Sequence, residues 1–92
     1  MSNTSPIILE EMFAPGCHTC KAFEMMWETI KGNFPQVELR RVDITSERGQ
    51  ELIAKYMIFA SPALIINGEL FSTGGFDKEK LITKLNVLSH LS

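Results

Sequence analysis

The chain has 92 residues, of which 45% are hydrophobic and 22% charged, and a formal net charge of −2. This length allows one compact domain, residues 1–92, and the near-average composition excludes a disordered chain. Lysine and arginine are spread along the chain, without the basic stripe typical of nucleic-acid binding. No apolar run approaches the roughly 20 residues needed to span a bilayer. We therefore expect a small globular monomer with neither nucleic-acid nor membrane partners.

The first six residues are polar and carry no charged side chain. They lack the positive segment and the small-residue cleavage site of a secretory signal peptide, so we expect a cytoplasmic protein. The cysteine content favours the same location. Only Cys17 and Cys20 are present, whereas a small secreted scaffold would use more cysteines, spread along the chain to close long loops.

The first predicted element is a buried strand over residues 7–13, an apolar run interrupted only by Glu10 and Glu11. Its length and the Pro-Gly turn signal after it are typical of such a strand. A helix is predicted to begin at or just after Cys17 and to end at the Gly-Asn pair of residues 32–33. Its apolar residues recur at helical spacing: Ala22, Phe23, Met26, Trp27 and Ile30.

Residues 37–44 predict a second strand, whose higher charge places it nearer the edge of the sheet. Ser46 is then predicted to cap a second helix. The apolar face of this helix is expected to consist of Leu52, Ile53, Tyr56 and Met57. The first predicted strand, the first helix and the second strand form a strand–helix–strand unit. Such a unit gives a parallel pair of strands joined by a right-handed crossover.

The second half of the chain predicts a hairpin followed by a helix. Residues 63–66 form a short apolar strand, Asn67-Gly68 is a two-residue hairpin signal, and residues 69–72 form the returning strand. After a Gly-Gly break, Asp77 is predicted to cap the last helix, with Phe76 placed to contact Leu81. The expected element order is therefore β-α-β-α-β-β-α, an α/β fold. The buried stripe of the last helix is predicted to be Leu81, Ile82, Leu85 and Leu88.

The two cysteines lie three residues apart at the predicted start of the first helix. Disulfide exchange needs a thiolate that attacks, a second thiol that resolves the mixed disulfide, and access for a partner. The unpaired N–H groups and the dipole at a helix N-terminus favour a thiolate at Cys17. Cys20 should lie one turn further along, on the same face and deeper. We therefore expect Cys17 to be the nucleophile and Cys20 the resolving thiol.

Two nearby basic residues are candidates for tuning this chemistry, and His18 would do so in its protonated form. His18 and, further away, Lys21 would lower the pKa of Cys17, the alternative for His18 being a side chain that simply points into solvent. The cysteine pair also has two alternative interpretations, a structural disulfide and a zinc or copper site. A closed zinc site requires four ligands, and only His18 and His90 remain as further candidates. The strand–helix context favours redox chemistry, so we expect no metal and no cofactor beyond the cysteine pair.

The segment Phe13-Ala14-Pro15-Gly16-Cys17-His18-Thr19-Cys20-Lys21 resembles the active-site segment of thioredoxins and their small glutaredoxin-like relatives. Ser61-Pro62-Ala63, followed by a strand and Asn67-Gly68, resembles the segment that carries the family's cis-proline, and the Gly74-Gly75 break also matches. The resemblance extends from about Ile7 to Leu88. It implies a thioredoxin-like fold, in which a four-stranded mixed sheet with the spatial strand order 2-1-3-4 is flanked by three helices.

The resemblance also implies roles for single residues. Pro62 would follow a cis peptide bond and face the cysteines, and Ser61 would offer its backbone to an extended partner segment. The alternative is a trans proline that opens an edge strand. Glu11 aligns with a buried acid that assists proton transfer at the second cysteine. One of Glu10 and Glu11 must face elsewhere, and because acidic residues are mostly exposed, a solvated charge at the end of the strand is the favoured interpretation of Glu11.

These residues predict a thiol–disulfide oxidoreductase that exchanges electrons between the Cys17/Cys20 dithiol and protein disulfides. A reductant of a class that the residues do not specify is its second expected partner. Thioredoxins usually have Trp before the first cysteine and Gly-Pro between the two, where this chain has Gly16 and His18-Thr19. A thioredoxin's reductant and redox potential therefore do not carry over to this chain.

Two alternative functions share the same predicted fold. A glutathione-coupled glutaredoxin is the first, because Gly74-Gly75 followed by Asp77 is similar to a glutathione-binding stretch, although the basic and aromatic contacts of that stretch are not evident. A metal-handling module or a redox-inert adaptor is the second, because Cys-x-x-Cys is also common metal-ligand spacing.

Overall fold

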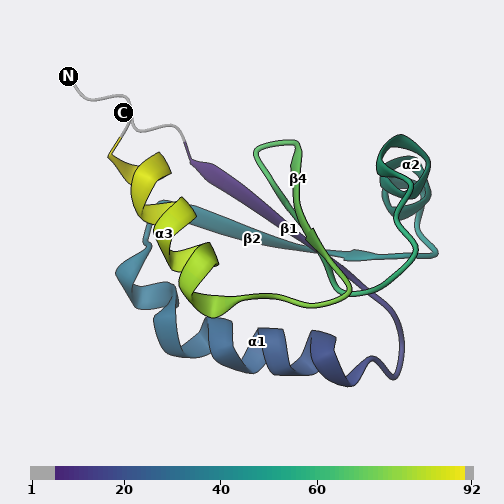
Figure 1. The fold of residues 1–92 in the computed structure, drawn as a ribbon, viewed down its shortest axis with the longest axis horizontal. Helices are drawn as coiled ribbons and strands as arrows, with labels where there is room; N and C mark the ends of the chain where they lie inside the picture. The colour runs from purple at the N-terminus through teal and green to yellow at the C-terminus, as the bar shows by residue number, and fades with distance from the viewer. Residues whose placement is uncertain (1–5, 91–92) are drawn as a thin grey trace.

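The computed structural model describes residues 6–90, which form one sheet with helices on both of its faces (Figure 1). Residues 1–5, on which most of the expectation of a cytoplasmic location rests, lie outside the described residues. None of the helices between residues 6 and 90 has the length and apolar character needed to cross a membrane. In chain order, the elements are β1 (Ile7–Phe13), α1 (His18–Ile30), the 3-10 helix η1 (Lys31–Asn33), β2 (Val37–Asp43), α2 (Glu47–Tyr56), β3 (Ala63–Ile66), β4 (Glu69–Thr73) and α3 (Lys78–Ser89).

The sheet is mixed and has the order β2-β1-β3-β4, which confirms the predicted topology and the edge position of β2. Strand β1 pairs with β2 in parallel and with β3 antiparallel, and β3 pairs with β4 antiparallel. β1 is thus an inner strand with a neighbour on each side. In this register Glu11 lies between Arg41 of β2 and Leu64 of β3.

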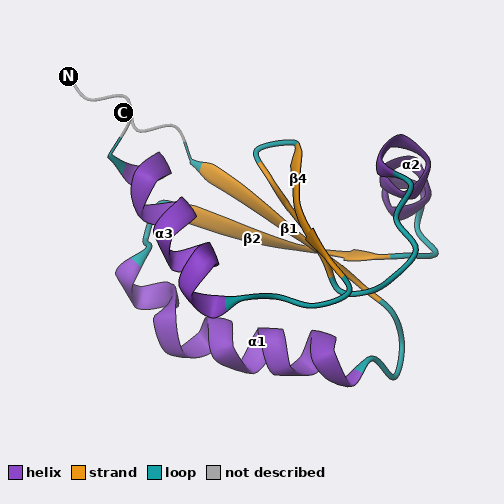
Figure 2. Cartoon of the chain, viewed as in Figure 1, coloured by secondary structure: helices purple, strands orange, loops and turns teal. Residues whose placement is uncertain are grey.

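Each face of the sheet carries its own hydrophobic core. Helices α1 and α3 lie beside each other on one face, whereas α2 lies apart from them against the other (Figure 2). The larger core, on the side of α1 and α3, is built from Ile7, Leu9, Phe23, Trp27, Ile30, Phe34, Leu64, Ile66, Leu81 and Leu85. The smaller core, on the side of α2, is built from Met12, Val42, Leu52, Ile58, Ala63 and Ile65.

Both predicted helix caps are confirmed. The hydroxyl of Ser46 accepts a hydrogen bond from the Gly49 N–H at 3.0 Å, and the carboxylate of Asp77 accepts one from the Lys80 N–H at 3.0 Å. These side chains satisfy backbone donors that the first turn of a helix leaves unpaired. The two bonds fix where α2 and α3 begin.

Two residues predicted to lie on apolar helix faces are in fact exposed. Ala22 of α1 lies beside the buried face, which runs through Cys20, Phe23 and Trp27. Met57 follows the end of α2 with a φ of 54°, and its side chain is 68% exposed. The left-handed backbone turns the chain out of the helix, so helical periodicity no longer places Met57 over the core.

Gly49 lies where the first turns of α2 pack against the end of β2. A Cβ atom at this position would overlap the carbonyl oxygen of Asp43 and lie 2.9 Å from the Cα of Ile44. We expect Gly49→Ala to lower the free energy of unfolding by about 1 to 3 kcal/mol, because the overlap outweighs the better helix propensity of alanine. Urea unfolding measures the difference. Gly32→Ala is the matched control, since no atom lies within 4 Å of a Cβ there, and equal effects of the two variants would contradict the packing argument.

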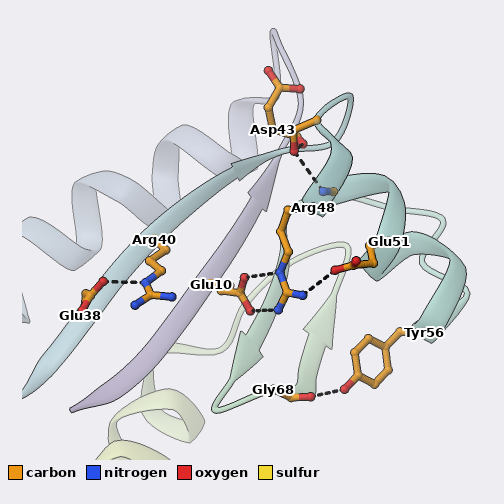
Figure 3. A network of polar contacts seen from close by, with 10 residues as sticks. Glu10, Glu38, Arg40, Asp43, Arg48, Glu51, Tyr56 and Gly68 are labelled. Carbon is orange, nitrogen blue, oxygen red and sulfur yellow. Dashed lines mark hydrogen bonds and ion pairs between the residues drawn. The ribbon is translucent and has the colours of Figure 1, made fainter.

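An ion pair between a half-exposed arginine and a buried carboxylate ties α2 to the centre of the sheet (Figure 3). Glu10 of β1 is only 6% exposed, and Arg48 of α2 donates to its two carboxylate oxygens from Nε and Nη2, both at 2.9 Å. The remaining terminal nitrogen of Arg48 donates to Glu51 at 2.8 Å. Successive residues of a strand point to opposite faces, so β1 carries one carboxylate toward α2 and the next, Glu11, toward α1.

Candidate functional site

A tight turn joins β1 to α1 and delivers the first cysteine to the start of the helix. Gly16 has a φ of 76°, and the N–H of Cys17 donates to the carbonyl of Ala14 at 3.2 Å. Pro15 followed by a glycine with positive φ is the sequence signature of a type II turn. Because the chain leaves this turn directly into α1, Cys17 becomes the N-cap residue of the helix.

Cys17 and Cys20 form a disulfide at the N-terminus of α1, with their Cα atoms 5.2 Å apart. The Sγ of Cys17 accepts a hydrogen bond from the Cys20 N–H at 3.1 Å. Cys17 is partly exposed, whereas Cys20 is 2% exposed, and the first turn of the helix contains no acidic residue. The expected placement of one accessible and one deeper sulfur at a helix N-terminus is therefore confirmed.

The loop before β3 comes against the cysteine pair. The hydroxyl of Ser61 donates to the Sγ of Cys17 at 3.5 Å, a contact between residues 44 positions apart. The Ser61–Pro62 peptide bond is cis, as the resemblance implies, and Pro62 is fully buried. The alternative of a trans proline is wrong. Ser61 is partly exposed, and its side chain lies next to Cys17.

The two candidate tuning residues are exposed and lie beside the cysteine pair. His18, the first residue of α1, and Lys21 are both exposed, and both line a pocket together with Cys17 and Cys20. The same pocket is also lined by two charged residues of α1 and β2 that the sequence analysis did not single out, Glu24 and Arg41.

Glu11 is not the solvated strand-end charge that residue statistics favour. Its side chain is 0% exposed, because β1 is an inner strand and α1 covers this face. Within residues 6–90, neither carboxylate oxygen of Glu11 has a hydrogen-bond partner. The nearest cation is Arg41, whose Nε lies 3.6 Å from Oε1 of Glu11. The structure therefore places a nearly unpartnered carboxyl group inside the fold.

Burial is the main reason why Glu11 holds its proton. The pKa of Glu11 is raised to about 8, chiefly because burial removes the charged form from water and secondly because the carboxylate of Glu24 lies nearby. Arg41 acts in the opposite direction and offsets part of this effect. A carboxyl group with a pKa close to neutrality can both donate and accept a proton under ordinary conditions.

Glu24 and Arg41 were missed by the sequence analysis, although the sequence contains a signal for each. Arg41 donates from Nη2 to Glu24 at 2.9 Å, and its guanidinium lies 4.1 Å from the centre of the Phe13 ring. Aligning the two parallel strands from their first residues places Arg41 beside Glu11. Glu24 lies four positions after Cys20, which puts both on one face of α1.

An apolar pocket lies near the other side of the Ser61 loop, against α2. Phe59 stands at its rim with 88% of its surface exposed. The residues that line the pocket are Met12, Ile44, Ile53, Ile58, Phe59, Ala60 and Ser61. Because Ser61 also contacts Cys17, the pocket lies near the Sγ of Cys17. In the described part of the chain, no cluster of three or more His, Cys, Asp and Glu side chains is arranged to hold a metal ion.

The chain is similar to curated plant proteins over most of its length. Protein disulfide-isomerases from Triticum aestivum and Hordeum vulgare are each 31% identical over 74 residues. These matches cover 76% of this chain but only 14% of each plant protein, so the chain corresponds to a small part of them.

Solved structures and a family profile agree on the fold. A thioredoxin from Fasciola hepatica is 25% identical, with a TM-score of 0.67 over 91% of this chain and 82% of the other. An oxidised thioredoxin from Arabidopsis thaliana is 22% identical, with a TM-score of 0.70 over 92% of this chain and 76% of the other. The profile described as a thioredoxin domain matches residues 10–86. With this profile covering most of its length, the chain belongs to the thioredoxin family.

Proposed function

We propose that this protein is a thiol–disulfide oxidoreductase that exchanges two electrons with protein disulfides through Cys17 and Cys20. The observation that carries the proposal is the position of the Cys17 sulfur. It accepts a hydrogen bond from a backbone N–H in the first turn of α1, belongs to a partly exposed residue, and is contacted by Ser61 of the cis-proline loop. A helix N-terminus stabilises a thiolate, which is the form of cysteine that attacks a disulfide.

The reaction needs no group beyond the two cysteines and a proton acceptor. In the dithiol form, the thiolate of Cys17 attacks one sulfur of the partner disulfide, and the other partner sulfur leaves as a thiolate that takes a proton from solvent. The thiol of Cys20 then gives up its proton and attacks the Sγ of Cys17. The second partner sulfur leaves as a thiolate with the electron pair of the mixed disulfide and takes a proton from solvent. The partner is reduced to two thiols, and the Cys17–Cys20 disulfide remains.

Glu11 is the proposed acceptor of the Cys20 proton. Its buried carboxyl group lies on the α1 side of β1, and Cys20 is the buried member of the pair on α1. A pKa of about 8 supports this role, because the ionised form is accessible near neutral pH and the proton is easily returned. When the partner reduces this protein, the same carboxyl group would give a proton to the departing Cys20 thiolate.

The proposed partner segment is extended and lies along the Ser61 loop. The backbone of Ser61 would pair with it, as the family resemblance implies, and the apolar pocket beside Ser61 would take one of its side chains. Exposed hydrophobic surface next to a reactive group is typical of a protein-binding site. Phe59, almost fully exposed at the rim, adds a large apolar contact.

Redox equilibration tests the proposed function directly. The protein is incubated in graded glutathione redox buffers, the thiols are trapped, and mass measurement gives the oxidised fraction. We expect the Cys17–Cys20 pair to cycle reversibly, with a potential between about −270 mV, typical of a reductant, and about −120 mV, typical of an oxidant that forms disulfides. A pair that fails to cycle contradicts the proposal, and equilibrium dialysis with zinc and copper(I) would then test the metal-handling alternative. Stable, specific glutathione adducts would favour the glutaredoxin alternative instead.

A further inference from the structure

We infer that Glu24 is a positioning residue for proton transfer at the cysteine pair, because it holds the terminal nitrogen of Arg41 and so prevents this arginine from closing a bidentate ion pair with Glu11. The inference deepens the proposed function and rests on it for its mechanistic meaning. It assigns a role to a residue of α1 that lies one turn beyond Cys20 and on the same helix face.

Arg41 divides its donors between two carboxylates, Glu24 and Glu11. Its Nη2 lies 2.9 Å from Glu24, while its Nε lies 3.6 Å from the buried Glu11, beyond hydrogen-bond distance. Stacking over the ring of Phe13 also holds the guanidinium, with its central carbon 4.1 Å from the ring centre. Glu24 is 30% exposed and Arg41 49% exposed, so their pair lies between the buried carboxyl group and solvent.

The same protein shows what an arginine does with a buried carboxylate when both its Nε and its Nη2 are available to that carboxylate. On the opposite face of β1, Arg48 presents the same two nitrogens, Nε and Nη2, to the two oxygens of Glu10 at 2.9 Å each (Figure 3). Its outer partner, Glu51, binds the third nitrogen, Nη1, and leaves that pair intact. Glu24 instead takes Nη2, one of the two donors that a bidentate pair with Glu11 would need.

The charge balance at Glu11 depends on how Arg41 is shared between Glu24 and Glu11. The charged groups that face it are Glu24 from α1 and Arg41 from β2, whereas β3 places the apolar Leu64 opposite. A bidentate guanidinium strongly favours the ionised carboxylate. If Arg41 were released from Glu24 and bound Glu11 through both Nε and Nη2, Glu11 would therefore lose its proton at neutral pH. By occupying Arg41, Glu24 keeps a transferable proton on Glu11, and its own negative charge acts in the same direction.

Two substitutions separate the positioning effect from the charge of Glu24. In Glu24→Gln the negative charge is lost, but the amide oxygen can still accept from Arg41 and hold it. In Glu24→Ala both the charge and the acceptor are lost, and Arg41 is free to close on Glu11. We expect both to move the titration of Glu11 toward acid, Glu24→Ala by about one pH unit or more and Glu24→Gln by clearly less.

The measurement is the chemical shift of the Glu11 carboxyl carbon, followed by NMR as the pH is varied. Its signal is assigned as the one that is missing from the spectrum of Glu11→Gln. The oxidised protein is used, so the cysteines do not titrate. Glu51→Gln is the matched control, because it removes an outer carboxylate from the other arginine and should leave the Glu11 titration unchanged. Equal shifts in Glu24→Ala and Glu24→Gln would overturn the positioning role, since the charge alone would then account for the effect. Absence of a shift would overturn the inference altogether.

A kinetic measurement connects the titration to the reaction. Reduced protein mixed with a small aromatic disulfide releases one thiolate on attack by Cys17 and a second on resolution by Cys20. The rate of the second phase should rise with pH around a midpoint. In Glu24→Ala we expect this midpoint to fall by the same amount as the midpoint of the Glu11 titration measured by NMR. A shifted titration with an unchanged kinetic profile would overturn the role in proton transfer and leave the oxidoreductase function standing. Failure of the wild-type protein to release either thiolate would overturn the proposed function itself, and this role with it.

Discussion

Replacing Cys17 by serine is expected to reduce the rate of insulin disulfide reduction, measured by turbidity with dithiothreitol as reductant, to the uncatalysed background. Serine keeps the size of the side chain but supplies no thiolate, and no other accessible sulfur lies at this site because Cys20 is buried. Thr19→Ala is a suitable control, since Thr19 is exposed between the two cysteines and has no assigned role. Activity retained in Cys17→Ser would contradict the proposed mechanism.

The companion variant, Cys20→Ser, should behave differently from Cys17→Ser. Attack by Cys17 remains possible, but resolution does not, so the protein is expected to accumulate as a mixed disulfide with its partner. Non-reducing electrophoresis and mass measurement detect this adduct. Cys17→Ser run in parallel should give none. An adduct formed equally by both variants would show that the assignment of nucleophile and resolving thiol is wrong.

The stability of the oxidised protein is expected to fall as the pH rises from about 4.5 to about 8. Folding raises the pKa of Glu11 from 4.5 to about 8, so the folded state binds more protons than the unfolded chain in this window. The free energy of unfolding must therefore decrease with increasing pH, by on the order of a few kcal/mol across the window. Urea unfolding at half-unit pH intervals measures the slope.

Glu11→Gln tests whether this residue is responsible. The amide carries no proton equilibrium, so the decline between pH 4.5 and pH 8 should largely disappear in this variant. Asp43 also titrates, but two hydrogen bonds from Thr45 hold the pKa of Asp43 below its ordinary value of 3.8, and its contribution is therefore lost only at more acid pH. A wild-type profile that is flat across the window would show that Glu11 is ionised in the folded protein.

Local signals in the sequence were sufficient for most of the fold. Caps at Ser46 and Asp77, the Pro-Gly turn before Cys17 and the Asn67-Gly68 hairpin all depend on a few neighbouring residues, and the structure has each of them where it was expected. The position of Cys17 at the helix N-terminus followed from the same kind of local signal. The strand order required the family resemblance, because hydrophobic periodicity does not say which strands are neighbours.

The surroundings of Glu11 depended on contacts between distant segments. Residue statistics favour an exposed acid, but β1 is an inner strand and the burial of Glu11 comes from elements that are far away in the sequence. Arg41 lies beside it only through the register of two parallel strands. The prediction that Met57 lies on the apolar face was wrong for a different reason. Met57 itself adopts a left-handed backbone conformation, which ends the helical periodicity on which the prediction depended.

The contact between Ser61 and Cys17 joins residues 44 positions apart in the chain. Ser61 is synthesised after Cys17, and cleavage of the chain between the two residues would separate them. A fragment that ends before residue 61 contains both cysteines and all of α1, but neither the Ser61 hydroxyl nor β3, the strand that covers one edge of β1. Such a fragment would expose its thiols to small oxidants without offering the surface along which we propose that a protein partner lies. The proposed binding surface for a protein partner therefore exists only once the chain extends past residue 61.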